Sequence, residues 1–163
     1  MLLTITRFLQ LFFMGLYTGI LFGDRIGVSP VRPKLPAASF VLYQQQLHLV
    51  YGKLMPVLVV GGFVAGVSSL VLLRRNYRER EFLFIAIAVL CNAAVGILTK
   101  LINVPINEVL MTWQVSSPPE NVMQLWAPWE GSHTIRTVIA LIGFACLTYA
   151  YISRKATNNR PSS

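Results

Sequence analysis

The sequence predicts an all-α integral membrane protein, a four-helix bundle with a long extracytoplasmic loop between its third and fourth helices. Of the 163 residues, 55% are hydrophobic and 12% are charged, whereas a soluble globular chain is about 25% charged. The apolar residues gather in four runs long enough to cross a hydrocarbon core of about 30 Å. We therefore expect a single domain over residues 1–156, followed by a disordered tail at 157–163. The expected spans are residues 4–23, 39–73, 82–102 and 134–153.

Positive charge is concentrated directly after two of the apolar runs and gives the chain a net charge of +8. Such clusters mark the cytoplasmic side, so we expect both termini in the cytoplasm and the protein in the plasma (inner) membrane. No aromatic-interleaved basic patch supports nucleic-acid binding. The expected partners are the lipid bilayer and a lipophilic small molecule, and the sequence leaves open whether a homo-oligomer forms. The two clusters are Arg74, Arg75, Arg78 and Arg80, and Arg154, Lys155 and Arg160.

The first span contains Arg7 near its start, followed by an apolar run from Phe8 to Phe22. A secretory signal peptide starts in the same way, but no small-residue cleavage site follows, which favours a spanning helix. Residues 24–36 contain three prolines and a glycine, a composition that predicts a connecting loop.

The second span is the longest helix that the sequence predicts. Residues 37–73 extend about 55 Å at 1.5 Å per residue, more than the bilayer core requires. Its polar start, residues 43–48, is therefore expected at or above the membrane surface, and Pro56 is expected to kink the helix. Gln44, His48 and Tyr51 share one side of this helix. Gly61, Gly62 and Gly66 form a small-residue face for packing.

The second half of the chain has the same pattern of span, connection and span. A charged turn at 74–81 precedes the third span, where Asn92 is expected to make an interhelical hydrogen bond. Residues 103–132 contain four prolines and no Lys or Arg, which predicts a long extracytoplasmic loop. The fourth span follows, with Ser132 or Thr134 as a candidate N-cap.

This topology brings polar residues from several helix ends to one membrane face. They are expected to enclose a pocket open both to lipid-soluble molecules and to water. The residues predicted at similar depth are His48, Tyr51, Lys53, Lys100, Asn103, Asn107, Trp126, Trp129, His133 and Arg136, with Tyr17 and Thr18 near them.

The two histidines permit three kinds of chemistry. They are candidate axial ligands of haem or ligands of another metal. The sequence does not identify the cofactor, and the expectation is none or haem. Without a metal, a histidine can remove a proton from an activated carbon acid, and asparagine and arginine can stabilise the oxyanion that forms. Structural alternatives exist for the other groups. The tryptophans can form an interfacial belt, the asparagines can cap the third helix, and Arg136 can pair with Glu130 or Glu108.

Two motifs resemble those of the anthrone oxygenase-like family of small membrane proteins. One is Asn103-Val-Pro-Ile-Asn107, which ends the third span. The other is the spacing Trp-x-x-Trp-x-x-x-His-x-x-Arg-Thr over residues 126–137, before the last apolar run. The resemblance implies a four-span fold over nearly the full chain, and family members that oxidise anthrones to anthraquinones. The residues that occupy the family's motif positions are Asn103, Asn107, Trp126, Trp129, His133 and Arg136.

Two functions of different classes follow as hypotheses. The first is an oxygen-dependent oxidoreductase, a monooxygenase-like enzyme for an anthrone-, phenol- or quinone-like substrate at the outer membrane face. The second is a non-enzymatic membrane protein: a haem-binding, assembly or partner-binding subunit. A proton-coupled transporter is disfavoured because the spans contain no acidic residue. In the first hypothesis the catalytic candidates are His133, Asn103, Asn107 and Arg136, and the substrate-binding candidates are Trp126, Trp129, Tyr51 and His48.

Overall fold

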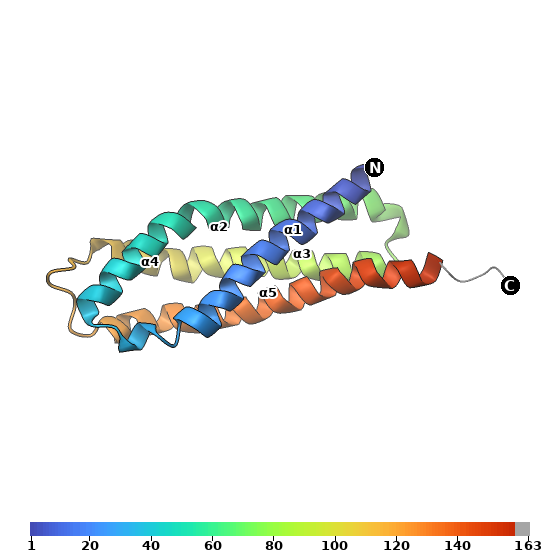
Figure 1. Cartoon of the computed structure of the whole chain (residues 1–163). Coiled ribbons are helices and arrows are strands. Elements are labelled where there is room, and N and C mark those ends of the chain that lie inside the picture. The colour runs from blue at the N-terminus through green and yellow to red at the C-terminus, as the bar shows by residue number, and fades with distance from the viewer. Residues whose placement is uncertain (159–163) are drawn as a thin grey trace.

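The computed structural model describes residues 1–158, and the side chains of residues 1–153 (Figure 1). The described chain is all-α, as the sequence predicts. Short π-helical stretches extend α1 over Asp24–Val28 and join α3 to α4 over Thr99–Asn103. The α-helices are α1 (Leu2–Gly23), α2 (Ala37–Leu73), α3 (Arg80–Leu98), α4 (Val104–Thr112) and α5 (Val122–Asn158). Of the predicted tail, residues 157 and 158 fall in α5, and residues 159–163 lie outside the described residues.

Four helical segments are long and apolar enough to cross a membrane: Leu2–Lys34, Ala37–Asn76, Arg80–Thr112 and Val122–Ser153. Helix α1 packs against α2 and α5, and α3 packs against the same two helices, so the four segments form a closed ring. The N-terminus, the last turns of α5 and the turn between α2 and α3 lie at one end, here called the termini end (Figure 1). The connections 24–36 and 113–121 lie at the opposite end, the loop end.

The predicted long loop over residues 103–132 is wrong in extent. The third helical segment continues through α4 to Thr112, and α5 begins at Val122, so only residues 113–121 are outside a helix. Two of the prolines lie in helices. Pro105 stands in the first turn of α4, where its missing N–H costs little, and Pro128 lies inside α5. A proline removes one backbone donor, and α5 continues through that loss.

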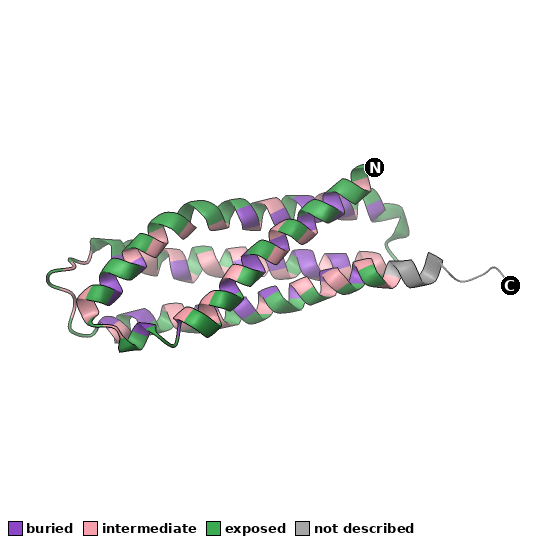
Figure 2. Ribbon diagram, in the orientation of Figure 1, coloured by how far each residue is buried: buried purple, intermediate pink, exposed green. Residues whose placement is uncertain are grey.

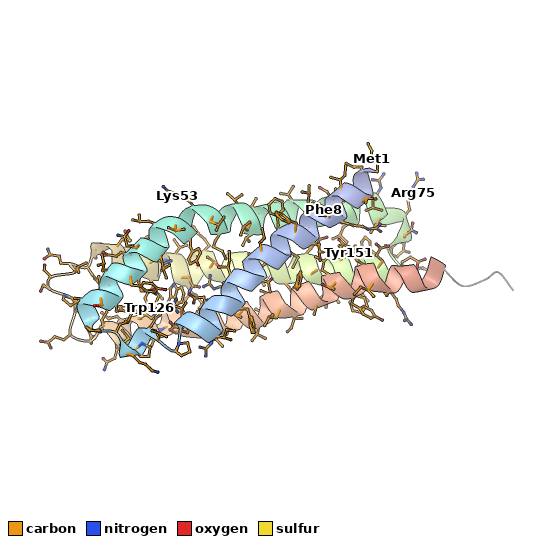
Figure 3. All side chains as sticks on the ribbon, viewed as in Figure 1. Met1, Phe8, Lys53, Arg75, Trp126 and Tyr151 are labelled. Atoms are coloured by element: carbon orange, nitrogen blue, oxygen red, sulfur yellow. The ribbon has the colours of Figure 1, made fainter. Side chains whose placement is uncertain are left out.

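The connection between α1 and α2 is also more helical than predicted. The π-helical stretch Asp24–Val28 is followed by a 3₁₀ turn at Arg32–Lys34. The prediction of α2 over residues 37–73 is confirmed to the residue. Figure 1 shows that α2 bends part-way along its length, and Figure 3 labels Lys53 near the bend. Pro56, three residues further along, supplies the cause because it cannot donate the backbone hydrogen bond of its turn.

Each helix has buried and exposed faces (Figure 2). Many large apolar side chains lie on the exposed faces, and several polar groups are buried between the helices. The amide of Asn92 donates to the carbonyl oxygen of Val59 at 3.1 Å, which confirms the interhelical hydrogen bond predicted for this residue. At the termini end, Arg7 of α1 forms an ion pair with Glu81 of α3. The hydroxyl of Tyr151 donates to Gln10 at 3.0 Å and thereby links α5 to α1.

Gly66 allows α2 to approach its neighbours closely. A Cβ atom there would lie 2.6 Å from Val89 Cγ2 and 2.7 Å from Gln10 Nε2, whereas a Cβ at Gly19 would have nothing within 4 Å. We expect Gly66→Ala to lower the free energy of unfolding by about 1–3 kcal/mol through overpacking. Gly19→Ala should be neutral or stabilising, because alanine favours a helix by about 1 kcal/mol. Thermal unfolding of both variants in the same detergent measures the difference, and equal melting temperatures would contradict the packing described.

Candidate functional site

A cavity of about 690 Å³ lies among the helix ends at the loop end of the molecule. Its size is typical of small-molecule sites, which range from about 300 to 1,000 Å³. Most of its surface is apolar, and all four helical segments contribute to its wall. It brings together every site residue that the sequence predicts, namely His48, Tyr51, Asn103, Asn107, Trp126, Trp129, His133 and Arg136. Tyr17 and Thr18 are buried in the interior and do not line it.

His133 is almost fully buried and contacts charged groups through both ring nitrogens. It is 1% exposed. The guanidinium of Arg136 approaches its Nδ1 at 3.3 Å, and Oδ2 of Asp24 lies 3.0 Å from its Nε2. Arginine can only donate, so Nδ1 carries the lone pair and Nε2 carries the proton. The Nε2–H bond is not aligned with the carboxylate oxygen, so the contact is a close electrostatic pair rather than a well-formed hydrogen bond.

Asp24 is held in place by Arg32, and neither residue was recognised as functional from the sequence. Arg32 is 2% exposed and donates to both oxygens of Asp24, at 2.7 and 2.9 Å. Its other terminal nitrogen donates to Glu130 of α5 at 2.7 Å and to Ser29 at 3.0 Å. The connection after α1 is thereby fastened to α5. The sequence did contain a signal for Asp24, because this carboxylate directly follows an apolar run. No neighbouring residue pattern indicated which residue it would pair with.

Arg136 has no carboxylate partner within ion-pair distance in the described part of the chain. One terminal nitrogen donates to Thr99 Oγ1 at 2.8 Å and the other faces His133. The predicted pairing of Arg136 with Glu130 or Glu108 is therefore wrong, because Glu130 pairs with Arg32 instead. The guanidinium is 6% exposed, and its Nε has no hydrogen-bond partner. A buried guanidinium without a carboxylate partner is stabilised by an anionic or strongly polarised oxygen, so Arg136 favours binding of such an oxygen in the cavity.

Three aromatic rings of α5 form a continuous stack along the cavity wall. The centroids of Trp126 and Trp129 are 4.5 Å apart, and those of Trp129 and His133 are 4.9 Å apart. The guanidinium of Arg32 lies 4.9 Å from the Trp129 ring. Trp126, at the loop end in Figure 3, is 2% exposed and donates to Glu130 at 3.1 Å. This burial argues against an interfacial belt role for Trp126.

The two asparagines of the motif are used differently. The Asn103 amide donates to the carbonyl of Trp129 at 3.3 Å and accepts from Ser132 at 2.8 Å. It therefore fastens the third helical segment to α5, and it makes no capping bond to α4. Asn107 is half-buried and makes no hydrogen bond within residues 1–153, so its amide is available in the cavity.

This difference predicts opposite outcomes for two matched substitutions. We expect Asn103→Ala to lower the free energy of unfolding by about 1–3 kcal/mol, because Ser132 and the Trp129 carbonyl lose a buried partner. Asn107→Ala should leave thermal stability and the elution profile in detergent unchanged. If Asn107→Ala aggregated while Asn103→Ala stayed folded, the assignment of the two amides would be reversed.

His48 and Tyr51 line the cavity from α2 and are half-buried. Among the described residues, no group of three or more His, Cys, Asp or Glu side chains could hold a metal ion. A metal or haem ligand also needs a free ring nitrogen. In His133 the Nδ1 faces a guanidinium and the Nε2 faces a carboxylate. Both ring nitrogens of His133 are covered in this arrangement, and the ligand role of the two histidines stays a prediction.

A comparison with protein families finds a match that includes most of the cavity residues. A family model described as anthrone oxygenase matches residues 47–146, which include the six motif residues and the histidine of α2. The matched segment begins after Asp24 and Arg32. No curated protein and no solved structure matches the chain.

Proposed function

The chain belongs to the anthrone oxygenase family, and from this premise we propose that it is an oxygen-dependent oxidoreductase of the membrane. Its substrate would be a lipophilic anthrone-, phenol- or quinone-like molecule. The observation that carries the proposal is the chain of contacts Asp24–His133–Arg136 in the wall of a largely apolar cavity. Such a wall suits an aromatic ring system, and the polar chain suits proton removal beside a carbonyl group.

The surface of the protein supports a place in the bilayer. Four segments are long and apolar enough to span it, and many large apolar side chains point outward. The basic residues of the turn between α2 and α3, together with Arg154 and Lys155 of α5, lie at the termini end, which by the positive-inside tendency would face the cytoplasm. The cavity at the loop end would then lie near the outer membrane surface. A lipophilic substrate would reach it from the membrane.

The proposed reaction converts an activated CH₂ group into a ketone. A base removes one carbon-bound proton, and the resulting enolate carbanion adds to dioxygen and, after protonation, gives a hydroperoxide. Loss of the second carbon-bound proton then breaks the O–O bond, forms the new C=O bond and releases water. One oxygen atom enters the product and the other leaves as water. Dioxygen takes up all four electrons, so the balance needs no further reductant.

His133 would act as the base in this reaction. Asp24 beside Nε2 would hold the imidazole in one tautomer and stabilise the imidazolium after protonation. In this structure Arg136 covers the lone pair of Nδ1. A substrate oxygen that attracts the guanidinium would uncover this lone pair and would at the same time gain a donor for its developing negative charge. Asn107 offers a further donor, and Trp126 and Trp129 form the apolar wall.

Oxygen uptake tests the proposal. Purified protein in detergent, given an anthrone, should consume one dioxygen for each anthraquinone formed, faster than the protein-free solution. With labelled oxygen gas, the new carbonyl should carry one labelled atom. Ser68→Ala is a suitable control, because its hydroxyl bonds only Val64 of the same helix and lies outside the cavity. A rate equal to that of the protein-free solution would contradict the proposal.

A second candidate is a non-enzymatic subunit, and one observation favours it. Most polar groups at the loop end bind one another, as Arg32 and Asn103 do. In that case the motif would serve to hold the helix ends together. Substitution of Trp129 or Asn107 by alanine would then reduce the yield of folded protein. Folded, monodisperse variants without turnover would instead support the enzyme.

A further inference from the structure

Gln44 is a buried amide without a hydrogen bond in the wall of the cavity. It lies in the first part of α2, is 4% exposed, and lines the cavity together with His48 and Tyr51. Its Oε1 is fully enclosed without a hydrogen-bond partner, whereas its Nε2 is not enclosed and makes no hydrogen bond to residues 1–153. Buried amides in folded proteins are nearly always bonded. An unbonded one beside a cavity therefore indicates a ligand.

The neighbouring Gln45 shows what a structural glutamine does in the same helix. Its Nε2 donates to the carbonyl oxygens of Leu110 and Trp113, at 3.1 and 2.9 Å. These two bonds fasten the end of α4 to α2. Gln44 has no such task, although it is more deeply buried than its half-buried neighbour. Its amide is thus kept in an apolar wall at a cost in stability.

Resting on the proposed function, we infer that Gln44 determines specificity by binding a hydroxyl group of the aromatic substrate. A hydroxyl both donates and accepts, so it can donate to Oε1 or accept from Nε2. The terminal torsion of glutamine is broad, which lets the amide turn either atom toward the ligand. A carbonyl group on the substrate could accept from Nε2 but would leave Oε1 without a donor.

Two other unbonded polar atoms of wall residues, Trp129 Nε1 and Arg136 Nε, are fully enclosed by the protein, so a ligand in the cavity does not reach them in this arrangement. The Gln44 amide differs because its Nε2 is not enclosed. A hydroxyl group can act as both donor and acceptor toward this amide, so the inferred substrate class is a hydroxylated aromatic ketone.

Binding measurements with two products test this inference. The probes are anthraquinone and a dihydroxyanthraquinone, and binding is followed by quenching of tryptophan fluorescence, since Trp126 and Trp129 line the cavity. The intact protein should bind the hydroxylated probe about tenfold more tightly than the parent compound. In Gln44→Leu the two affinities should become equal. The melting temperature of this variant should stay the same or rise, because an unbonded buried amide has been removed.

Gln45→Leu is the matched control. It should lower the melting temperature through loss of two hydrogen bonds and should keep the preference for the hydroxylated probe. An unchanged preference in Gln44→Leu overturns the inference, and so does failure of the intact protein to bind either probe. The proposed function fails separately. If the protein shows the Gln44-dependent preference but does not accelerate oxygen uptake, the inference about Gln44 stands and the proposed reaction is wrong. If it accelerates oxygen uptake but shows no such preference, the reaction stands and the inference is wrong.

Discussion

Replacement of His133 by glutamine is expected to lower the rate of anthrone oxidation at least about 100-fold, the range in which a general base contributes. Glutamine keeps one donor and one acceptor, so it can still contact Asp24 and Arg136. It cannot take up a proton near neutral pH. The folded state should therefore survive while turnover is lost. Initial rates above the protein-free rate, together with a melting temperature close to that of the intact protein, measure this effect.

His48→Gln is the matched control for this prediction. His48 lines the same cavity but makes no hydrogen bond to the described residues. Its replacement should change the rate less than about tenfold, as expected for the loss of an apolar or weakly polar contact. Equal losses in both variants would point to a shared role of the histidines and would contradict the assignment of the base to His133.

Replacement of Arg32 by methionine is expected to lower the free energy of unfolding by about 3–5 kcal/mol. This is the usual loss when one member of a buried ion pair is removed and its partners stay behind without compensation. Asp24 and Glu130 would both lose their cation, and α5 would lose its tie to the connection after α1. Loss of folded protein or a strongly lowered melting temperature in detergent would be the observed result.

Lys34→Met controls for the loss of positive charge in the same short 3₁₀ turn. Lys34 is exposed, and no ion pair to the described carboxylates involves it. Its replacement should change the free energy of unfolding by less than about 0.5 kcal/mol. If Arg32→Met and Lys34→Met were equally stable, the hydrogen bonds and ion pairs of Arg32 would not stabilise the loop end of the molecule.

The helices and the gathering of the site residues follow from patterns in the sequence. Long apolar runs predict helices because a bilayer leaves the backbone few other choices. Alternating helix directions then place His48 of α2 and His133 of α5 at the same end. The eight predicted site residues line one cavity for this reason.

The parts that the sequence does not predict depend on contacts between distant segments. Pro105 and Pro128 suggested a loop, yet each is accommodated in a helix. The role of Asp24 depends on Arg32, which binds both Asp24 and Glu130 of α5, and no local pattern in the sequence encodes these contacts. The split between Asn103 and Asn107 likewise depends on where Ser132 lies after folding.

Proton removal from carbon can be measured without oxidation, and this measurement tests the central claim most directly. In heavy water without oxygen, the protein should accelerate the exchange of deuterium into the reactive carbon of an anthrone, read by mass spectrometry. His133→Gln should exchange at the protein-free rate. If the intact protein catalysed aerobic oxidation but left this exchange at the protein-free rate, His133 would not be the base that we propose.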